Sequence, residues 1–584
     1  MNTLNRWLHS AAAGSLITVS SLIASQAAAQ SPLLAPAPTL PNATTFKPPV
    51  YQAMPGQTTI TQLPVAMPVV NAPGKDLPDA VQQGGPVTMA APAPCAECAT
   101  GFDFSKVPDV KPFPPSYNFP QPTGPGYYSF LDVLQGNCRE APPKYGYTRS
   151  AFQPPPFFTS DFRYLDDPNN TDHVWSDELK RIKFGDNWMF STGGQAWYRY
   201  MTVNNQQLTA PHGEENLARV RTYGDLWYKD TFRFYVEMLS ANTWNQGFAA
   251  GPNDVAAFDF LNLFIDVKLF DLDGHNIYGR VGKFEMPLGS QRLVSNIDFT
   301  NVRRTFEGAS LIYRGENWDV DAWWARPTIT NPYGPSGWDR KQDFAGAFTT
   351  YHPNKTDLID VYYLYLANRT PVKQLGIVRG DYALNTFGSR YMGNANGFLW
   401  DFEGAMQLGS TSGANTVAGM ATAGLGYNFK SAPWNPTVWA FYDYASGDHS
   451  PGKGNFDTFN QLFAFGHNFL GGMDLFGRQN LQDINAHVSL NPTKWLTFWT
   501  QYHYLRLDSA TDALYGFTGN AVRRDATGKA GVDVGNELNF IFNFHVTANQ
   551  DIQFGYGHLF GGNFMRATGK ANVDYTYLTY NLKW

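Results

Sequence analysis

The feature that most constrains this chain is a series of alternating segments that runs from about Trp188 to the end of the sequence. Each segment spans about 10 to 14 residues and is bounded by Gly, Asn, Asp or Pro. Such alternation places apolar side chains on one face of a strand and polar side chains on the other. In the clearest case, Glu537, Asn539, Asn543 and His545 alternate with Leu538, Phe540, Phe542, Phe544 and Val546, and Ile541 is the exception. One face suits lipid and the other suits water.

Composition separates the two kinds of membrane-spanning chain. Hydrophobic residues make up 43% of the sequence and aromatic residues 15%, yet the mean hydropathy is −0.34. A membrane helix needs about 20 consecutive apolar residues, and no such run follows the N-terminus. A barrel strand crosses a bilayer with alternating side chains, so its average hydropathy stays polar. We therefore predict an all-β fold, a transmembrane antiparallel β-barrel, although a large soluble β-sandwich or propeller would show the same alternation.

The number of segments and the character of the last one give the predicted barrel its topology. Counting to the C-terminus gives about 18 strands, an even number that leaves both barrel ends in the periplasm. The last strand is expected from about Val573 to the aromatic Trp584. We expect it to close the barrel by pairing with a first strand near Met189 to Met201.

The connections between segments differ in length. Tyr228-Lys229-Asp230 and Asn491-Pro492-Thr493 are short turns, which we predict to be periplasmic. The longer Gly-rich stretches 242–254 and 446–481 are predicted to be extracellular, because outer-membrane barrels have short periplasmic turns and long outer loops.

The N-terminal part of the chain has a different composition, which divides the sequence into four regions. Residues 1–29 combine a polar start, a short apolar stretch and a run of alanines, as in a secretory signal peptide that is removed. Residues 30–156 are rich in Pro, Ala, Gln and Thr and are expected to be a largely disordered periplasmic extension, because they cannot bury enough apolar surface. A short ordered patch is predicted near 127–134. Residues 157–187 are then a linker, and 188–584 are the barrel.

Charge and cysteine content exclude some classes of protein. The net charge of −6 argues against nucleic-acid binding, which needs clustered Lys and Arg. Cys95 and Cys98 stand in Cys-Ala-Glu-Cys with Cys138 left over, which fits a local disulfide or two thiols better than a zinc site. No cofactor is predicted.

Two stretches carry the most distinctive residue pattern. Residues 281–294 read VGKFEMPLGSQRLV, and residues 301–308 read NVRRTFEG. Further segments read APWNP at 432–436, DYASGD at 443–448 and FDTFN at 456–460. In order and spacing, these motifs closely resemble the bacterial alginate export family of outer-membrane proteins. The resemblance covers roughly Gly193 to Trp584 and leaves the N-terminal third uncovered.

The resemblance implies a monomeric barrel with a narrow, electropositive lumen that passes an anionic polysaccharide to the cell exterior. Lys283 is a departure, because the family usually has arginine there. Lysine keeps the charge but lacks the planar fork that binds a carboxylate with two hydrogen bonds. The resemblance therefore supports pore formation more strongly than selectivity for uronic acids.

Charged residues around these motifs are the candidates for the substrate path. Each sugar of an alginate-like polymer carries a carboxylate, and a low-dielectric wall strengthens its attraction to fixed guanidinium groups. The candidate lumen residues are Arg219, Arg221, Arg233, Glu237, Lys283, Glu285, Arg292, Asp298, Arg303 and Arg304.

A second role is open to each candidate arginine. They can instead pair with Asp298, Glu285 or Glu307 and hold an inner segment, 293–302, to the wall. For Arg199, Arg280 and Arg326 this structural role is favoured.

Catalytic and metal sites find little support in the sequence. It lacks a Gly-x-Ser-x-Gly elbow, a His-Glu-x-x-His pair and a P-loop. His487, His503 and His545 fall on separate strands, where outward or girdle positions are the common case. Asp448, Asp457 and Asp474 lie in a Gly-rich loop without EF-hand spacing, and a solvated outer loop explains them better than Ca²⁺.

The sequence therefore predicts an outer-membrane porin or exporter rather than an enzyme. Its partners would be outer-membrane lipid, an alginate-like anionic polysaccharide and components of the periplasmic export machinery or cell wall. The alternatives are a less selective small-solute porin, and a structural envelope protein anchored by its barrel.

Overall fold

The structure is a computed structural model, and it describes residues 102–107, 121–147, 154–205, 208, 212–246 and 250–584. The predicted signal peptide, Cys95 and Cys98 lie outside the described residues. All described residues belong to one compact unit, 92–584. None of the helices in this part of the chain is long and apolar enough to cross a membrane.

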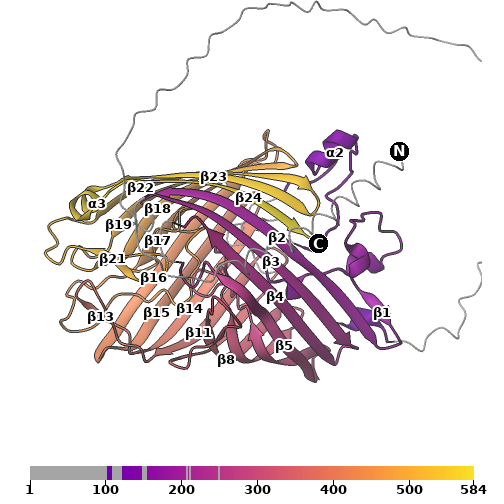
Figure 1. Ribbon diagram of the computed structural model, residues 1–584, viewed down its shortest axis with the longest axis horizontal. Helices are drawn as coiled ribbons and strands as arrows, with labels where there is room; N and C mark the ends of the chain where they lie inside the picture. Colours follow the sequence, from indigo (N-terminus) through magenta and orange to yellow (C-terminus); the bar gives the residue numbers. More distant parts are fainter. Residues whose placement is uncertain (1–101, 108–120, 148–153, 206–207, 209–211, 247–249) are drawn as a thin grey trace, which may run out of the picture. The chain divides into compact units, whose positions relative to one another are not determined.

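One antiparallel sheet of 20 strands forms the body of the protein (Figure 1). Two short strands, β1 (Ile182–Phe184) and β9 (Gly337–Trp338), pair only with β2 and β8 respectively. The other 18 each pair with two neighbours, and β2 pairs with β24, which closes the barrel. These strands are β2 (Trp188–Asn204), β3 (Gly213–Tyr228), β4 (Phe232–Trp244), β5 (Ala256–Leu272), β6 (His275–Phe284), β7 (Phe306–Arg314), β8 (Trp318–Ile329), β10 (Gln342–Tyr351), β11 (Leu358–Asn368), β14 (Tyr382–Ala395), β15 (Phe398–Thr411), β16 (Ala414–Asn428), β17 (Thr437–Ala445), β18 (Leu481–Thr493), β19 (Leu496–Leu507), β22 (Asp533–Thr547), β23 (Gln550–Gly561) and β24 (Val573–Lys583).

This topology confirms the predicted barrel and its strand number. In the register of the closing pair, Gln195 lies opposite Lys583 and Asn204 opposite Asp574. We call the end of the barrel at which β2 begins and β24 ends the near rim, and the opposite end the far rim. The turn at 229–231 lies at the near rim, as does the β18–β19 connection.

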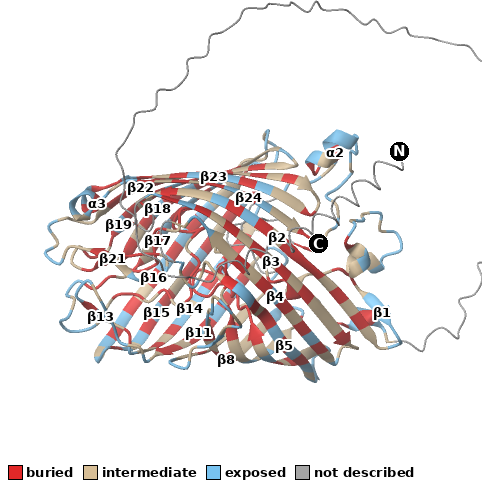
Figure 2. Ribbon diagram, in the orientation of Figure 1, coloured by how far each residue is buried: buried red, intermediate tan, exposed pale blue. Residues whose placement is uncertain are grey.

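Burial alternates along the barrel strands, as the sequence pattern predicts. Figure 2 shows buried and more accessible positions in succession along the strands. In β22 the outward residues are apolar, and Glu537 and Asn539 face the interior with 2% exposure or less. Ile541, the exception to the pattern, is also buried and joins an apolar cluster with Trp499. Trp323 likewise points inward, whereas its neighbour Trp324 is exposed.

Aromatic side chains gather at the strand ends of the near rim. Trp188 contacts Tyr228 with ring centroids 4.8 Å apart, and Trp318 contacts Tyr351 at 4.5 Å. Such amphipathic rings are the usual residues of a membrane interface. This arrangement fits the lipid-facing girdle of a barrel.

The remaining elements of the described chain are short. Outside the barrel sheet are the helices α2 (Phe130–Gln135) and α3 (Asn563–Thr568), and the small hairpins β12–β13 (Val372–Gln374, Ile377–Arg379) and β20–β21 (Ala513–Tyr515, Ala521–Arg524). Single-turn 3-10 helices are η1 (Phe104–Lys106), η2 (Phe157–Thr159), η3 (Arg163–Asp166) and η4 (Asp177–Leu179).

Helix α2 confirms the predicted ordered patch near 127–134. It begins after Ser129, whose side chain accepts from the backbone N–H of Asp132, and ends at the left-handed Gly136. Phe130 contacts Trp495 of the β18–β19 connection. Cys138 is exposed and forms no disulfide with any residue that the structure describes.

Two long connections fold into the barrel instead of extending from it. Residues 285–297, which follow β6, are all buried, and residues 458–480, which precede β18, are buried or partly buried throughout. The two segments pair with each other, because Phe463 N donates to Leu293 O at 2.9 Å and Ser295 N donates to Phe463 O at 3.0 Å. The prediction of 446–481 as a solvated outer loop is therefore wrong for most of its length, because its Phe, Leu and Met side chains pack against the inner wall.

A third segment enters the barrel from the near rim. Pro154, Pro156, Phe157, Phe158 and Phe162 are buried, and the three phenylalanines belong to the apolar cluster that includes Phe264 and Phe284 of the wall. The predicted boundary between a disordered extension and a linker at 156/157 cuts through this segment. Proline-rich composition does not indicate whether a segment packs into an apolar cavity formed by the rest of the chain.

Candidate functional site

The charged interior of the barrel begins on the hairpin β3–β4. Arg219 and Arg221 share the inner face of β3, with exposures of 0% and 1%, and Glu237 lies on the inner face of the neighbouring β4. The side chains alternate because the period of a strand is two residues. Both arginines therefore point into the interior of the barrel.

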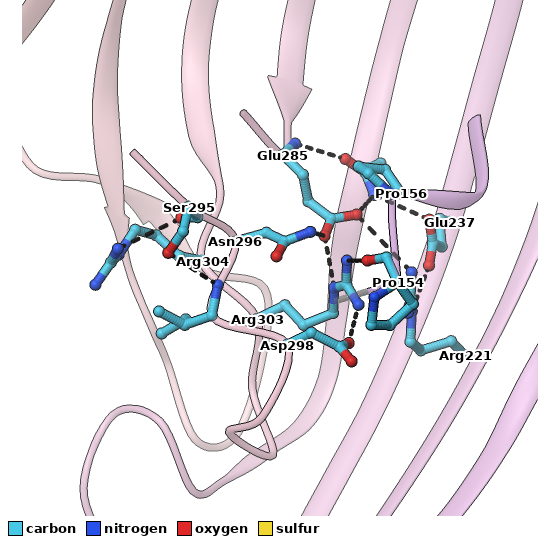
Figure 3. A network of polar contacts seen from close by, with 12 residues as sticks. Pro154, Pro156, Arg221, Glu237, Glu285, Ser295, Asn296, Asp298, Arg303 and Arg304 are labelled. Atoms are coloured by element: carbon cyan, nitrogen blue, oxygen red, sulfur yellow. Dashed lines mark hydrogen bonds and ion pairs between the residues drawn. The ribbon is translucent and has the colours of Figure 1, made fainter. Parts of the chain in front are cut away.

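Arg303, which directly follows the inner segment 293–302, is the centre of a buried ion-pair network (Figure 3). Its Nε donates to Glu285 at 2.5 Å, one Nη contacts Asp298, and the other donates to the carbonyl oxygen of Pro154 at 3.5 Å. Arg221 donates to Glu237 at 2.6 Å and lies 3.8 Å from Glu285. Two arginines and two glutamates thus share one buried space.

Amide groups complete the hydrogen bonds of these glutamates. Asn262 of β5 donates to both Glu237 and Glu285, each at 2.9 Å. Asn296 of the inner segment donates to Glu285 at 3.1 Å. A buried carboxylate is costly unless it is paired and hydrogen-bonded, and here both conditions are met.

Arg219 and Arg304 bind the inner segment mainly through its backbone. Arg219 reaches Asp298 Oδ1 at 3.1 Å and donates to the carbonyl oxygens of Asp298 and Thr300. Arg304 donates to the carbonyl oxygens of Ser295 and Phe463. Arg304 therefore joins the two inner segments to each other.

Two further candidates pair with aspartates of the wall. Arg233 makes a bidentate contact with Asp225, at 2.7 and 2.8 Å. Lys283 contacts both oxygens of Asp259 on β5. Neither basic group therefore lines the interior as an isolated charge.

Arg292, which lies between β6 and the inner segment 293–302, binds strand β15 of the wall. It donates to Asp401 at 2.8 Å and to Glu403 at 2.9 Å, both on β15, and Asp401 also accepts from Arg390 at 2.7 Å. Sequence reasoning missed Asp401, Glu403 and Arg390, as well as the buried pair Arg478–Asp443. The alternation of β14 and β15 would have placed these side chains on the inner face, but only the tertiary structure brings them to Arg292.

The structure therefore gives every candidate base except Arg304 a carboxylate partner. Asp298 and Glu285 hold the inner segment to the wall, which is the role that the sequence left open for them. The three arginines for which a structural role was favoured are also paired or engaged: Arg280 with Asp266, Arg326 with Asp343, and Arg199 with Thr579 and Phe299. Contact of any of these residues with a substrate stays a prediction.

A large cavity opens at the near rim. It has a volume of ≈ 1130 Å³ and is bounded by the near-rim parts of β2 to β8 and β10 and by residues 157–163 and 285–289. Most charged side chains around it are paired: Arg233 with Asp225, Arg280 with Asp266, Lys268 with Asp230 and Asp271, and Arg314 with Asp321. Trp227, Tyr278 and Phe284 add aromatic surface. We call this cavity the vestibule.

His487, His503 and His545 lie inside the barrel, so the expectation of outward or girdle positions for them is wrong. His487 and His503 have 0% exposure, and His545 has 7%. His503 contacts Asp483 at 2.7 Å and His545 contacts Asp551 at 2.6 Å. Among the residues that the structure describes, no group of three or more His, Cys, Asp or Glu side chains is arranged to hold a metal ion.

Comparison with known proteins identifies the family of the chain. The family model for alginate export matches residues 189–579, which is most of the barrel from β2 to β24. The chain belongs to the alginate export family. The resemblance of residues 281–294 and 301–308 is thus confirmed over residues 189–579, and the protein is an outer-membrane β-barrel porin of this family, whose members are transport barrels.

Solved structures of other barrels resemble this member of the alginate export family at low identity. OpdQ of Pseudomonas aeruginosa is 14% identical, with a TM-score of 0.46 over 68% of this chain and 97% of that one. OccAB1 of Acinetobacter baumannii is 12% identical, with a TM-score of 0.47 over 68% of this chain and 96% of that one. A search of curated proteins finds no match to the chain.

Proposed function

We propose that this porin exports an anionic polysaccharide of the alginate type, or fragments of one, across the outer membrane. Membership of the alginate export family over residues 189–579 is the observation that carries the proposal. In this proposal the near rim faces the periplasm, and the barrel contacts outer-membrane lipid as a monomer.

The arginine cluster supplies a chemical reason for an anionic substrate. Arg219, Arg221 and Arg303 lie close to one another, because they share Asp298 and Glu285 as partners. Arg219 Nε and Arg221 Nη2 are buried and make no hydrogen bond in the described part of the chain. Uronate carboxylates can bind such guanidinium groups through charge-assisted hydrogen bonds, and a chain of carboxylates would pass from one to the next.

One observation favours a less selective porin for small solutes. The charges around the vestibule and in the interior are mostly paired, so the attraction of the arginines for a distant anion is largely cancelled by adjacent carboxylates. A pore of this kind discriminates between solutes mainly at short range. The two functions therefore predict different electrostatic potentials in the open pore, and so different ion selectivities.

Planar-bilayer recordings of the full chain distinguish the two. An exporter of anionic polymer is expected to give open events that prefer anions in a KCl gradient and that are blocked by polymannuronate but not by neutral dextran. Open events that prefer cations, or that polymannuronate leaves unchanged, would overturn the polysaccharide proposal. Unselective, unblocked events would support the small-solute porin.

A further inference from the structure

Residues 154–163, which precede the barrel in sequence, stand between two cavities of its interior. Phe157, Phe158 and the residues up to Arg163 line the vestibule. Pro154 lines a second cavity of ≈ 40 Å³, together with Arg199 and Asp298. The segment therefore lines both the cavity at the near rim and the small cavity next to Arg199 and Asp298. We call residues 154–163 the plug segment.

Basic side chains of the wall and of the inner segment hold the plug segment by its carbonyl groups. Arg303 donates to Pro154 O at 3.5 Å, and Arg233 donates to Phe158 O at 2.9 Å. Figure 3 shows Pro154 beside Arg303, on the side of the network where Arg221 pairs with Glu237. Carbonyl oxygens of the chain thus occupy positions at guanidinium groups that an incoming anion would seek.

The phenylalanine rings fill the apolar space between these bases. The Arg221 guanidinium lies 4.2 Å from the ring of Phe157, and the Arg280 guanidinium lies 4.8 Å from the ring of Phe158. Phe158 also meets Phe264 edge-on at 5.2 Å. Cation–π and aromatic contacts of this kind give the segment a specific seat.

The backbone of the plug segment is less firmly attached than that of the other inner segments. Its regular backbone hydrogen bonds are local ones within η2, such as Thr159 N to Pro156 O at 3.1 Å. By contrast, residues 285–305 make backbone hydrogen bonds to other segments, such as Val302 N to Asn253 O at 2.9 Å and Ser295 N to Phe463 O at 3.0 Å. Among the residues that the structure describes, the plug segment is held by arginine hydrogen bonds to its carbonyl groups and by ring contacts, and it pairs with no barrel strand. It can therefore leave without breaking a strand pairing.

We propose that the plug segment is a removable stopper that closes the near-rim entrance, and that carboxylates of an arriving polymer displace it from Arg233 and Arg303. The closure itself requires no assumption about the substrate, whereas the displacement rests on the proposed function. Displacement is favourable because a guanidinium group binds a carboxylate more strongly than a neutral carbonyl. The polymer therefore opens the entrance that it uses.

Loosening the plug segment tests the closure. In KCl without polymer, the variant F157S/F158S is expected to raise the open probability more than about tenfold, which corresponds to about 1.4 kcal/mol of lost contacts. The matched control is F184S, an exposed phenylalanine at the same rim in β1, which should conduct like the original chain. Folding of both variants is checked by heat-modifiable gel mobility. A folded F157S/F158S protein with the original conductance would overturn the proposal.

Fixing the plug segment tests the same closure without removing side chains. In a chain whose three cysteines are changed to serine, the pair F158C/F264C is joined by a short bismaleimide. The cross-linked protein is expected to stay closed until the linker is cleaved, while each single variant treated with the reagent still opens. A cross-linked protein that conducts as before would show that the segment lies outside the ion path, and the stopper would be rejected.

Adding polymer to these experiments distinguishes failure of the stopper from failure of the proposed function. Polymannuronate should slow cross-linking of F158C/F264C, and neutral dextran should not. If the F157S/F158S variant opens but polymannuronate neither slows cross-linking nor blocks current, the stopper stands and the polysaccharide substrate falls. If polymannuronate blocks current while both plug experiments fail, the substrate stands and the stopper falls.

Discussion

Gly194 of β2 and Trp584 exchange both of their backbone hydrogen bonds. Gly194 N donates to Trp584 O at 2.9 Å, and Trp584 N donates to Gly194 O at 3.0 Å. This pair lies beyond the last paired residue of β24 and continues the seam that closes the barrel. The position requires glycine, because a Cβ there would stand 2.2 Å from Arg221 O and 2.5 Å from Trp584 Cζ2.

Substitution at the seam is expected to destabilise the barrel. G194V should lower the free energy of unfolding by about 1–3 kcal/mol, the usual cost of overpacking, and should lower the thermal midpoint in detergent. The control is G337A, because a Cβ at Gly337 meets nothing within 4 Å. Equal midpoints for G194V and the unmodified chain, measured by circular dichroism, would show that the seam is not tight.

The bridge from Arg292 to β15 is expected to contribute strongly to stability. R292A leaves Asp401 and Glu403 buried without this partner, which should cost about 3–5 kcal/mol. R369A is the matched control, because Arg369 is 58% exposed and its solvent-screened pair with Asp343 should contribute little to stability. Denaturant unfolding of both variants measures the difference. Similar losses for the two would contradict a buried bridge.

The network around Glu285 is expected to set ion selectivity. E285Q keeps the shape of the side chain but removes one buried negative charge, so the pore should shift toward anions. R303Q removes the opposite charge and should shift it toward cations. Reversal potentials in a KCl gradient give the direction, with E214Q at an exposed position of β3 as the control. Shifts of the same sign for E285Q and R303Q would rule out an electrostatic origin.

Gly471 allows the buried segment 458–480 to pack closely against the wall. A Cβ at this position would lie 2.2 Å from Glu537 Oε1, and the backbone φ of +107° already disfavours other residues. G471A should therefore loosen 458–480 and expose it to limited proteolysis. If the side-chain clash is the cause, the double variant G471A/E537A should recover part of the protection, because contacting residues are not additive. No recovery would assign the effect to the backbone conformation alone.

Local chemistry was enough to predict the wall of this protein. The sequence predicted the alternation in β22, the shared strand face of Arg219 and Arg221, and the closing strand from Val573. It could do so because strand periodicity is a property of neighbouring residues. The motifs at 281–294 and 301–308 also sufficed to indicate the family.

The contents of the barrel could not be inferred in the same way. Segment 458–480 was predicted to be part of an outer loop, yet it is buried in contact with strands that are distant in the sequence. For 293–302 the sequence left an inner position open, but it did not specify the contacts. Pro154, Pro155 and Pro156 placed the start of the plug segment in the predicted disordered extension, and residues 157–163 fell in the predicted linker. Its phenylalanines are ordered only because the wall offers Phe264 and Arg280 as partners.

The sequence by itself thus determined the strands, their alternation and the closed topology, because backbone pairing and side-chain period act over short distances. The tertiary structure alone decided which acid meets which base. Arg292 meets Asp401 and Arg303 meets Glu285 only after the barrel closes around the inner segments. Charge pairing depends on distances that no local pattern specifies.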